Sequence, residues 1–295
     1  MLSRRQSQNK DEATQIPETG CGSLSCNGSL YRVGGVDKKD TSHIRSNGEK
    51  MKRVKLTVAY DGTAYHGWQL QPGAITIESE LNRALSELLG TEIQVIGASR
   101  TDSGVHALCN VAVFDTDSRI PGEKFSYALN QRLPEDIRIQ LSEEVEPDFH
   151  PRYCDSEKTY EYRILNRRFP VPTERLYSYF YHYPLDVEKM QEATSYLIGR
   201  HDFASFCGAK AQVKSTIRIV TGIDVFREGD MITIRVSGRG FLYNMVRIIS
   251  GTLIEIGAGQ YPPEKMKEIL DAKNREAAGP TAPACGLTLM GIEFL

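Results

Sequence analysis

The fold of this chain depends on one stretch, Gly97-Ala98-Ser99-Arg100-Thr101-Asp102-Ser103-Gly104-Val105-His106, which lies between two apolar patterns typical of β-strands. Residues 93–96 precede it and residues 111–114 follow it, so we expect a connection between two strands. Within it, Asp-Ser-Gly is typical of a turn in which Asp102 caps its own backbone and Gly104 adopts an unusual φ. Asp102 is therefore either a residue that only shapes a turn or a carboxylate that the turn presents as a nucleophile.

Length and composition limit the classes of protein to which the chain can belong. Its 295 residues, 40% of them hydrophobic, are enough for a sizeable core and for two domains of ordinary size. No apolar run approaches the roughly 20 residues that a membrane helix needs, and residues 1–50 contain no apolar core of a signal peptide. We therefore expect a cytoplasmic protein with no membrane partner. The formal net charge of −2 leaves nucleic-acid binding open, because such binding depends on a local basic face.

Several common catalytic and metal-binding patterns do not occur in this sequence. The six cysteines are scattered, without Cys-x-x-Cys pairs or histidines at ligand spacing, which predicts reduced thiols and no structural zinc. The histidines likewise lack paired spacing, so we expect no metal. The second glycine of a nucleophile elbow and the Gly-Lys-Thr loop of a nucleotide enzyme are also missing. Hydrolases and nucleotide enzymes of those types are therefore disfavoured.

Residues 1–50 differ in composition from the rest of the chain. They are rich in Ser, Gly, Asn and charged residues and follow neither the helical nor the strand period, which predicts a disordered extension. A transit peptide is the functional alternative. It fits poorly, because Asp11, Glu12 and Glu18 are unlike an acid-poor targeting helix.

Residues 51–152 alternate strand-like and helix-like segments and form the first predicted half. Thr76 is a plausible N-cap for an apolar stripe that ends before Gly90, which predicts a helix. The other predicted elements are strands at 55–60, 93–96, 111–114 and 137–141, and a short helix at 123–132. Asp102 lies in this half, so if it is a nucleophile, residues 51–152 carry the catalytic residue.

The same kinds of element return in residues 153–295. Asp186 is predicted to cap a helix, and residues 242–256 form an almost continuously apolar helix. The other predicted elements are a strand carrying Tyr160, Tyr162 and Ile164 on one face, a hairpin of residues 223–226 and 231–236, a helix at 264–272 and a strand at 287–294. We therefore predict an α+β fold of two similar α/β halves, with antiparallel or mixed sheets packed by helices and a cleft between the halves.

Arg247 lies inside the apolar helix predicted for residues 242–256. Its stem could be buried while its head reaches water. Alternatively, if Asp102 projects into the same cleft, a bidentate pair would keep the carboxylate ionised and oriented. Arg100 competes for that role, and being two residues from Asp102 it could equally bind phosphate.

Aromatic residues of the second half have two readings, packing within a core or a surface on which nucleobases stack. Tyr160 and Tyr162 share a strand face, and packing explains most such strands. A platform for bases also needs exposed rings with cations nearby. Cations do surround Tyr160 in the sequence: Arg152, Lys158, Arg163, Arg167 and Arg168. RNA is therefore a physically reasonable partner.

Six motifs stand out in order along the chain: Tyr60-Asp61-Gly62, Gly67-Trp68-Gln69, Arg100-Thr101-Asp102-Ser103-Gly104-Val105-His106, Lys158-Thr159-Tyr160-Glu161-Tyr162, His201-Asp202-Phe203-Ala204-Ser205-Phe206 and Phe241-Leu242-Tyr243-Asn244-Met245-Val246-Arg247. Taken together, they resemble those of the TruA family of tRNA pseudouridine synthases. Order and spacing hold from Met51 to the C-terminus. The family usually has Ala at the position of Ser103 and Gly at that of Ser99, and both changes are small.

The resemblance implies a role for four residues. Asp102 would be the catalytic nucleophile, Arg247 its ion-pair partner and Tyr160 the ring against the target uracil. Arg100 would contact the RNA backbone or displace the flipped base. Arg247 should also depress the pKa of Asp102 in a partly dry cleft. The isomerisation uses neither an oxidant nor a phosphate donor, so no cofactor is expected.

The resemblance also implies a substrate and an assembly. Uridines at positions 38, 39 and 40 of the tRNA anticodon stem-loop would be converted to pseudouridine by a homodimer. The alternative from another class is a tRNA-binding protein or chaperone in which catalysis is lost or incidental. A pseudouridine synthase acting on another RNA is a further alternative. Loss of activity in an Asp102 variant that still binds tRNA would separate enzyme from binding protein.

Overall fold

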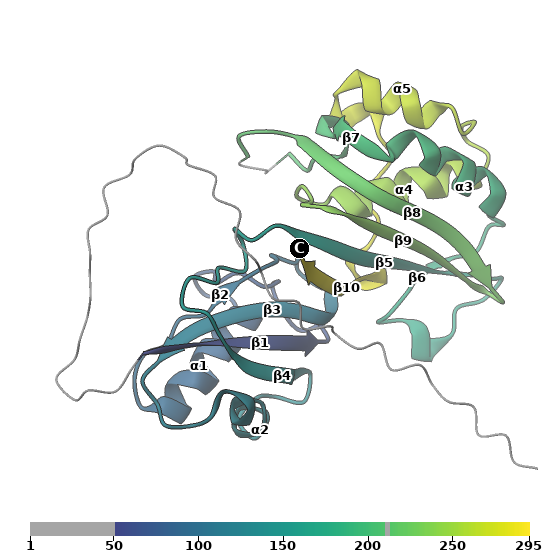
Figure 1. Ribbon diagram of the computed structural model, residues 1–295. Helices are drawn as coiled ribbons and strands as arrows, with labels where there is room; N and C mark the ends of the chain where they lie inside the picture. The colour runs from purple at the N-terminus through teal and green to yellow at the C-terminus, as the bar shows by residue number, and fades with distance from the viewer. Residues whose placement is uncertain (1–50, 210–212) are drawn as a thin grey trace, which may run out of the picture. The chain divides into compact units, whose positions relative to one another are not determined.

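The structure, a computed structural model, describes residues 51–209 and 213–295 (Figure 1). The predicted disorder of residues 1–50 lies outside the described residues. The strands are β1 Lys52–Tyr60, β2 Ile96–Gly97, β3 His106–Thr116, β4 Ile137–Val145, β5 Ser156–Asn166, β6 Tyr179–Tyr181, β7 Gly199–Asp202, β8 Ile217–Glu228, β9 Met231–Arg239 and β10 Leu287–Phe294. The α-helices are α1 Ile77–Leu89, α2 Phe125–Asn130, α3 Val187–Thr194, α4 Met245–Gly257 and α5 Lys265–Ala272.

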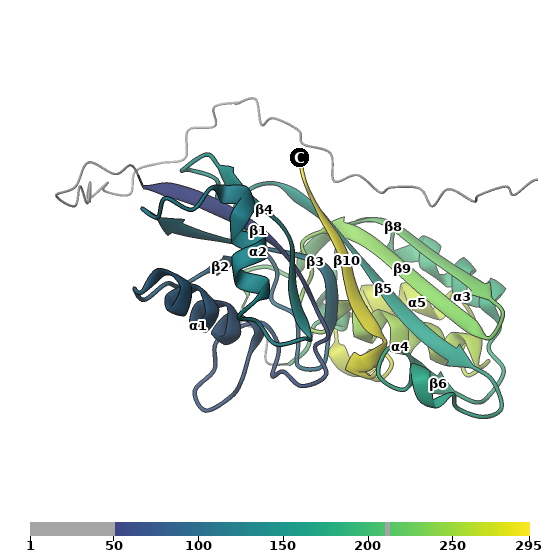
Figure 2. The ribbon, with the colours of Figure 1, turned by 90° about the horizontal axis from the view of Figure 1, so that it is seen from below.

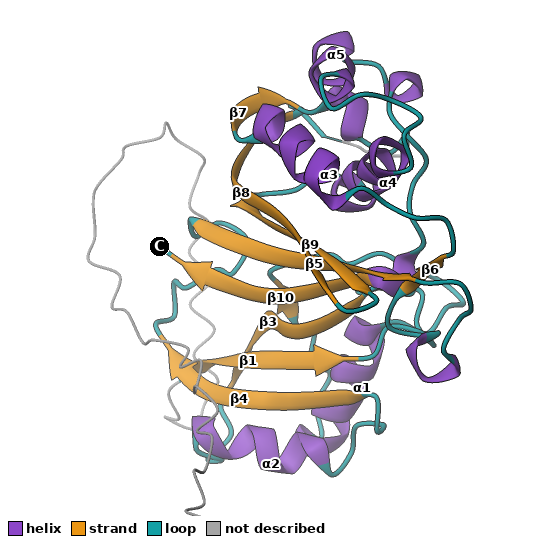
Figure 3. Cartoon of the chain, turned by 90° about the vertical axis from the view of Figure 1, so that its right-hand side faces the viewer, coloured by secondary structure: helices purple, strands orange, loops and turns teal. Residues whose placement is uncertain are grey.

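A single sheet runs through both predicted halves of the chain. Its ten described strands follow the order β4-β1-β3-β10-β5-β9-β8-β7, with β2 paired to β3 and β6 to β5 (Figure 3). The C-terminal strand β10 pairs in parallel with β3 and antiparallel with β5, so the sheet is mixed. The two halves therefore share one continuous sheet, joined by β10.

Helices cover the strands of each half separately. In the first half α2 packs against β4 and also contacts α1. In the second half α3 packs against β8, and α4 contacts both α3 and β5 (Figure 2). The predicted α+β class is confirmed. The predicted division at residue 152 falls in the connection between β4 and β5, and as a domain boundary it stays a prediction.

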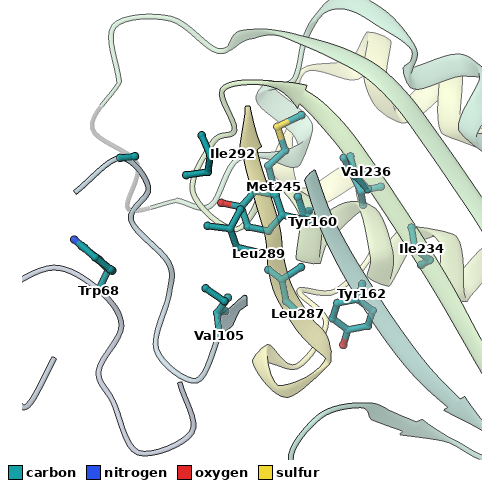
Figure 4. Packing of buried hydrophobic residues seen from close by; sticks show 14 of the residues in the cluster. Trp68, Val105, Tyr160, Tyr162, Ile234, Val236, Met245, Leu287, Leu289 and Ile292 are labelled. Atoms are coloured by element: carbon teal, nitrogen blue, oxygen red, sulfur yellow. The ribbon is translucent and has the colours of Figure 1, made fainter. Parts of the chain in front are cut away.

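The central strands carry the core beneath the candidate site. Tyr160 and Tyr162 of β5 lie opposite Leu289 and Leu287 of β10, and all four side chains are buried (Figure 4). The alternation predicted for β5 is confirmed, because Tyr160, Tyr162 and Ile164 all face this core. A strand with one buried face fixes the register of its neighbours. The position of Tyr160 is therefore set by the sheet.

Most predicted elements are confirmed, several with ends that differ by a few residues from the prediction, and two of the differences have a visible cause. Of the strand predicted for residues 93–96 only Ile96 is paired, as part of β2, because side chains of α1 take the preceding backbone donors: Ser86 Oγ accepts from Ile93 N at 3.0 Å, and Asn82 Oδ1 accepts from Val95 N at 2.9 Å. The helix predicted from residue 242 begins at Met245, because Asn244 adopts a left-handed φ of 60°. Asparagine tolerates that conformation better than most residues.

The start of α1 follows directly from its sequence. Thr76 Oγ1 accepts a hydrogen bond from Ser79 N, and Ser79 Oγ accepts one from Thr76 N, which completes a capping box. Gly90 ends the helix with a φ of 70°, a conformation that favours glycine. Both predicted ends of this helix are confirmed.

Removal of this cap should destabilise the first half measurably. We expect Thr76→Ala to lower the free energy of unfolding by about 1 kcal/mol, because Ser79 N loses its partner. Thr221→Ala, at an exposed position of β8, is the control and should change it by less than about 0.5 kcal/mol. Urea unfolding of both variants measures the difference, and equal effects would contradict the capping role.

Candidate active site

Asp102 lies on a turn in the connection from β2 to β3, as predicted. Val105 N donates to Asp102 O at 3.1 Å, and Gly104 has a φ of 77°. Trp68 N donates to Thr101 O at 3.1 Å, which ties the turn to the segment before α1. The turn is therefore held from both inside and outside.

Glycines let two other segments approach the Asp102 turn closely. A Cβ added to Gly62 would lie 2.0 Å from Val105 O, and one added to Gly67 would lie 2.6 Å from Thr101 O. No side chain fits at either position without moving the backbone. The chain segments around Tyr60 and Trp68 therefore pack directly against the turn.

Arg247 extends from the first turn of α4 to Asp102. Its Nη1 donates to Asp102 Oδ2 at 3.3 Å, and the two side chains are 17% and 18% exposed. Its Nε donates to Ala282 O at 2.8 Å, and Nη1 also donates to Asn244 Oδ1 at 3.1 Å. The prediction of an ion pair is confirmed. The predicted bidentate geometry is wrong, because Nε is bound to the backbone.

The contacts of the Arg247 head exclude the simple snorkelling alternative, since its nitrogens bind protein atoms. Arg100, the competing partner, is exposed. Among the described residues, the ion pair of Asp102 is formed with Arg247. Arg100 is thus available to a ligand in the site, while Arg247 is part of its framework.

The electrostatic balance at Asp102 differs from the prediction. Burial raises the pKa of the Asp102 carboxyl, while the charge and the hydrogen bond of Arg247 lower it, and the net shift is upward. The predicted lowering of the pKa by Arg247 is confirmed, but burial outweighs it, so the expectation of a depressed Asp102 pKa is wrong. The physical reason is that a single 3.3 Å contact compensates only part of the desolvation of a carboxylate inside the protein.

Tyr160 reaches the other side of the same turn. Its hydroxyl shares a 2.9 Å hydrogen bond with Ser99 Oγ, and its ring packs edge-on to Phe241, with centroids 5.1 Å apart. Burial raises the pKa of Tyr160 to about 12, the Ser99 hydrogen bond opposes the rise, and the charge of Asp102 adds to it. The phenol is therefore neutral at pH 7.

Two of the predicted cations lie close to Tyr160 and the nucleophile segment. Lys158 Nζ donates to Ala98 O at 2.9 Å, and Arg152 Nη2 donates to Gly97 O at 3.2 Å. Burial, with the nearby Arg152 charge, lowers the pKa of Lys158 to about 8.

The other predicted cations are used elsewhere. Arg163 pairs with Glu174, Arg167 pairs with Asp230, and Arg168 packs over the Phe169 ring. The predicted cluster around Tyr160 is therefore smaller than the sequence suggested. Because residues alternate across a strand, Arg163 lies on the opposite side of β5 from Tyr160 and Tyr162.

Comparisons with known proteins identify the family of this chain. A family model described as tRNA pseudouridine synthase matches residues 56–154 and 193–294. A relative from Ruminiclostridium cellulolyticum, named tRNA pseudouridine synthase A, is 49% identical over 245 residues, covering 83% of this chain and 100% of the relative. The chain belongs to this family. A second relative with that name, from Acetivibrio thermocellus, is 47% identical, covering 83% of this chain and all of the relative. A third, from Clostridium tetani and named tRNA pseudouridine synthase A 2, is 50% identical, covering 81% and 97%.

Membership in the tRNA pseudouridine synthase family makes the protein an isomerase and confirms the resemblance seen in its motifs. Asp102, Arg100, Tyr160 and Arg247 belong to the motifs quoted above. The first two, with Arg247, fall within the matched ranges, whereas Tyr160 lies between them. The individual roles of these residues stay predictions.

Sequence reasoning missed two groups that hold Arg247 in place. Asn244 Oδ1 and Ala282 O both accept hydrogen bonds from its guanidinium group. Asn244 was visible as a polar residue in the first turn of the apolar helix predicted for residues 242–256. Ala282 carried no signal, because only its backbone is used. Within residues 51–209 and 213–295, no cluster of three potential metal ligands occurs, and no helix is long and apolar enough to cross a membrane.

Proposed function

We propose that this protein converts uridines at positions 38, 39 and 40 of the tRNA anticodon stem-loop to pseudouridine, with Asp102 as nucleophile. The observation that carries the proposal is the ion pair of two largely buried side chains, Asp102 on a turn held by surrounding backbone and Arg247 on α4. A carboxylate that only shaped a turn could face solvent, whereas Asp102 is largely buried and paired with a cation from the other half of the chain.

The reaction breaks the N-glycosidic bond, rotates the detached uracil and joins C5 to C1′. The C5 proton leaves, and N1 ends with a proton, so neither an external oxidant nor a phosphate donor is consumed. The Asp102 carboxylate attacks either C1′ of the sugar or C6 of the base. Arg247 orients the carboxylate and stabilises its ionised form.

Tyr160 is proposed to lie against the uracil ring in the cleft. Its neutral phenol is an acceptor and donor rather than a ready base, since its pKa lies near 12. Removal of the C5 proton by Tyr160 would therefore require that the phenol first lose its own proton. The Ser99 hydroxyl, which shares a 2.9 Å hydrogen bond with the phenol, already carries a proton and cannot be the final acceptor, so the role proposed for Tyr160 is packing against the base.

The target nucleotide must leave the RNA stack, which costs a few kcal/mol. Arg100, exposed beside the nucleophile, is proposed to contact the RNA backbone or to fill the space left by the flipped base. We also propose that the protein acts in the cytoplasm as a homodimer. Support for the dimer comes from the family resemblance, and light scattering tests it.

The test of this function is tritium release from tRNA labelled at C5 of uridine. We expect one tritium to be released for each uridine converted, because C5 exchanges its hydrogen for the glycosidic bond. Mapping of modified sites should place pseudouridine at positions 38, 39 and 40. If labelled tRNA is bound and releases no tritium, the protein is a tRNA-binding protein or chaperone. Release from another RNA alone would sink the anticodon assignment.

A further inference from the structure

A fully buried polar residue, Asn110, lies behind the Asp102 turn. It lies on β3 opposite Val58 of β1 and is 0% exposed. Its Nδ2 donates to Ser99 O at 3.0 Å and to Tyr60 Oη at 3.2 Å, while its Oδ1 accepts from Val111 N at 2.9 Å. The side-chain amide of Asn110 therefore donates both to the segment that leads to Asp102 and to Tyr60.

Tyr60 continues this connection to the far side of Arg100. Its Oη shares a 2.7 Å hydrogen bond with Thr101 Oγ1. The chain Ser99–Asn110–Tyr60–Thr101 thus links the two residues that flank Arg100, and all four members are buried. We call this hydrogen-bonded chain the Asn110 brace. Asp102 follows Thr101 directly, so the position of its Cα depends on the brace.

The energetic cost of an amide inside a core indicates that the brace has a purpose. A buried polar group destabilises the fold unless it is hydrogen-bonded, and an apolar residue at this position would serve packing alone. The Asn110 amide instead donates to Ser99 O, in the segment that leads to Asp102, and to Tyr60 Oη. The adjacent backbone adds a further tie, since Ala98 N donates to Val111 O at 2.7 Å.

We propose that Asn110 is a positioning residue which, through Tyr60, holds the Ser99–Thr101 segment so that Asp102 meets Arg247 and the substrate in reactive geometry. This inference rests on the proposed function of Asp102. Asn110 is completely buried, so it has no exposed surface with which to bind RNA directly. Its removal should therefore lower kcat and leave the binding of tRNA almost unchanged.

The experiment compares Asn110→Ala and Tyr60→Phe with wild type by tritium release under saturating and limiting tRNA. We expect kcat to fall about 10- to 100-fold in each, since small displacements of a reacting group have effects of that order. KM should change by less than about threefold. The double variant should lose much less than the product of the two single losses, because both remove the same brace.

Asn130→Ala is the matched control. Asn130 of α2 also exchanges two hydrogen bonds with backbone, donating to Ile139 O at 2.9 Å and accepting from Ile139 N at 2.8 Å. It braces α2 against β4 and not the Asp102 turn. The Asn130→Ala substitution should therefore lower the free energy of unfolding, while kcat of the folded variant stays at the wild-type value.

Three results would overturn the positioning role. They are an unchanged kcat in folded Tyr60→Phe or Asn110→Ala, a rise in KM with constant kcat, or an equal loss of kcat in Asn130→Ala. Tyr60→Phe keeps the aromatic ring and so guards against a simple folding failure. Should wild type itself release no tritium, the proposed function fails. Active wild type, inactive Asp102→Ala and fully active brace variants would refute the positioning inference alone.

Discussion

Asp102→Ala should abolish tritium release from the anticodon stem-loop, a loss of more than about 10³-fold, with little change in the affinity for tRNA. The Asp102 side chain is held beside Arg247 and is 18% exposed, and an alanine at this position has no group that can attack the nucleotide. Binding should persist because the RNA backbone is anionic, and loss of a carboxylate does not remove an attraction to it. Filter binding and tritium release on the same preparation measure the two properties.

Asp115→Ala provides the matched control for this variant. Asp115 also lies in the first half, on β3, but it is exposed and forms its ion pair with Arg53 at 2.7 Å. Neither partner of this pair belongs to the candidate site, so the activity of the folded variant should remain at the wild-type level. If Asp102→Ala kept activity within tenfold of wild type, the nucleophile would have to be another group.

The local parts of the fold were predictable because short stretches of sequence decide them. Thr76 and Gly90 bound α1 through capping chemistry that involves only a few neighbours. The alternation of Tyr160 and Tyr162 likewise identified the buried face of β5. In contrast, the alternating pattern of residues 287–294 revealed a strand but not its partners. Its place between β3 and β5 depends on pairing over long sequence separations.

The candidate site was predictable in its residues and less so in its energetics. The turn motif, the apolar helix and the family motifs pointed to Asp102 and Arg247, and the structure brings the two together. The direction of the Asp102 pKa shift was wrong because burial comes from chain segments that only the tertiary fold assembles. The Asn110 brace was missed for a similar reason: a single polar residue in a strand pattern shows nothing of what it will contact.

Arg247→Gln should lower kcat/KM strongly at pH 7 and shift its acid limb to higher pH. In wild type the folded pKa of Asp102 lies above the usual 3.8, so the fraction of ionised nucleophile already declines above pH 3.8 as the solution is acidified. Arg247 supplies both effects that oppose burial, its charge and its hydrogen bond. Without it burial acts alone and the carboxylate protonates at still higher pH. At a pH below both acid limbs, kcat/KM of the variant should be lower than that of wild type by a further factor of about ten for every pH unit by which the limb has moved.

The same reasoning predicts how stability depends on pH in this variant. A carboxyl whose pKa is raised by folding does not destabilise the protein below its unfolded pKa, where both states hold the proton. Above the folded pKa the buried charge opposes folding in full. The loss of unfolding free energy in Arg247→Gln should therefore grow as pH rises from below 3.8 through the raised pKa of Asp102.

Arg247→Lys separates the charge of Arg247 from its geometry. Lysine retains the cation but cannot reproduce the simultaneous donors to Ala282 O, Asn244 Oδ1 and Asp102 Oδ2. It should return the acid limb towards that of wild type while kcat at the plateau stays low, because the carboxylate is ionised but poorly oriented. Profiles of kcat/KM against pH for the three proteins provide the test. An acid limb that stays at the same pH in Arg247→Gln would show that Arg247 does not control the ionisation of Asp102.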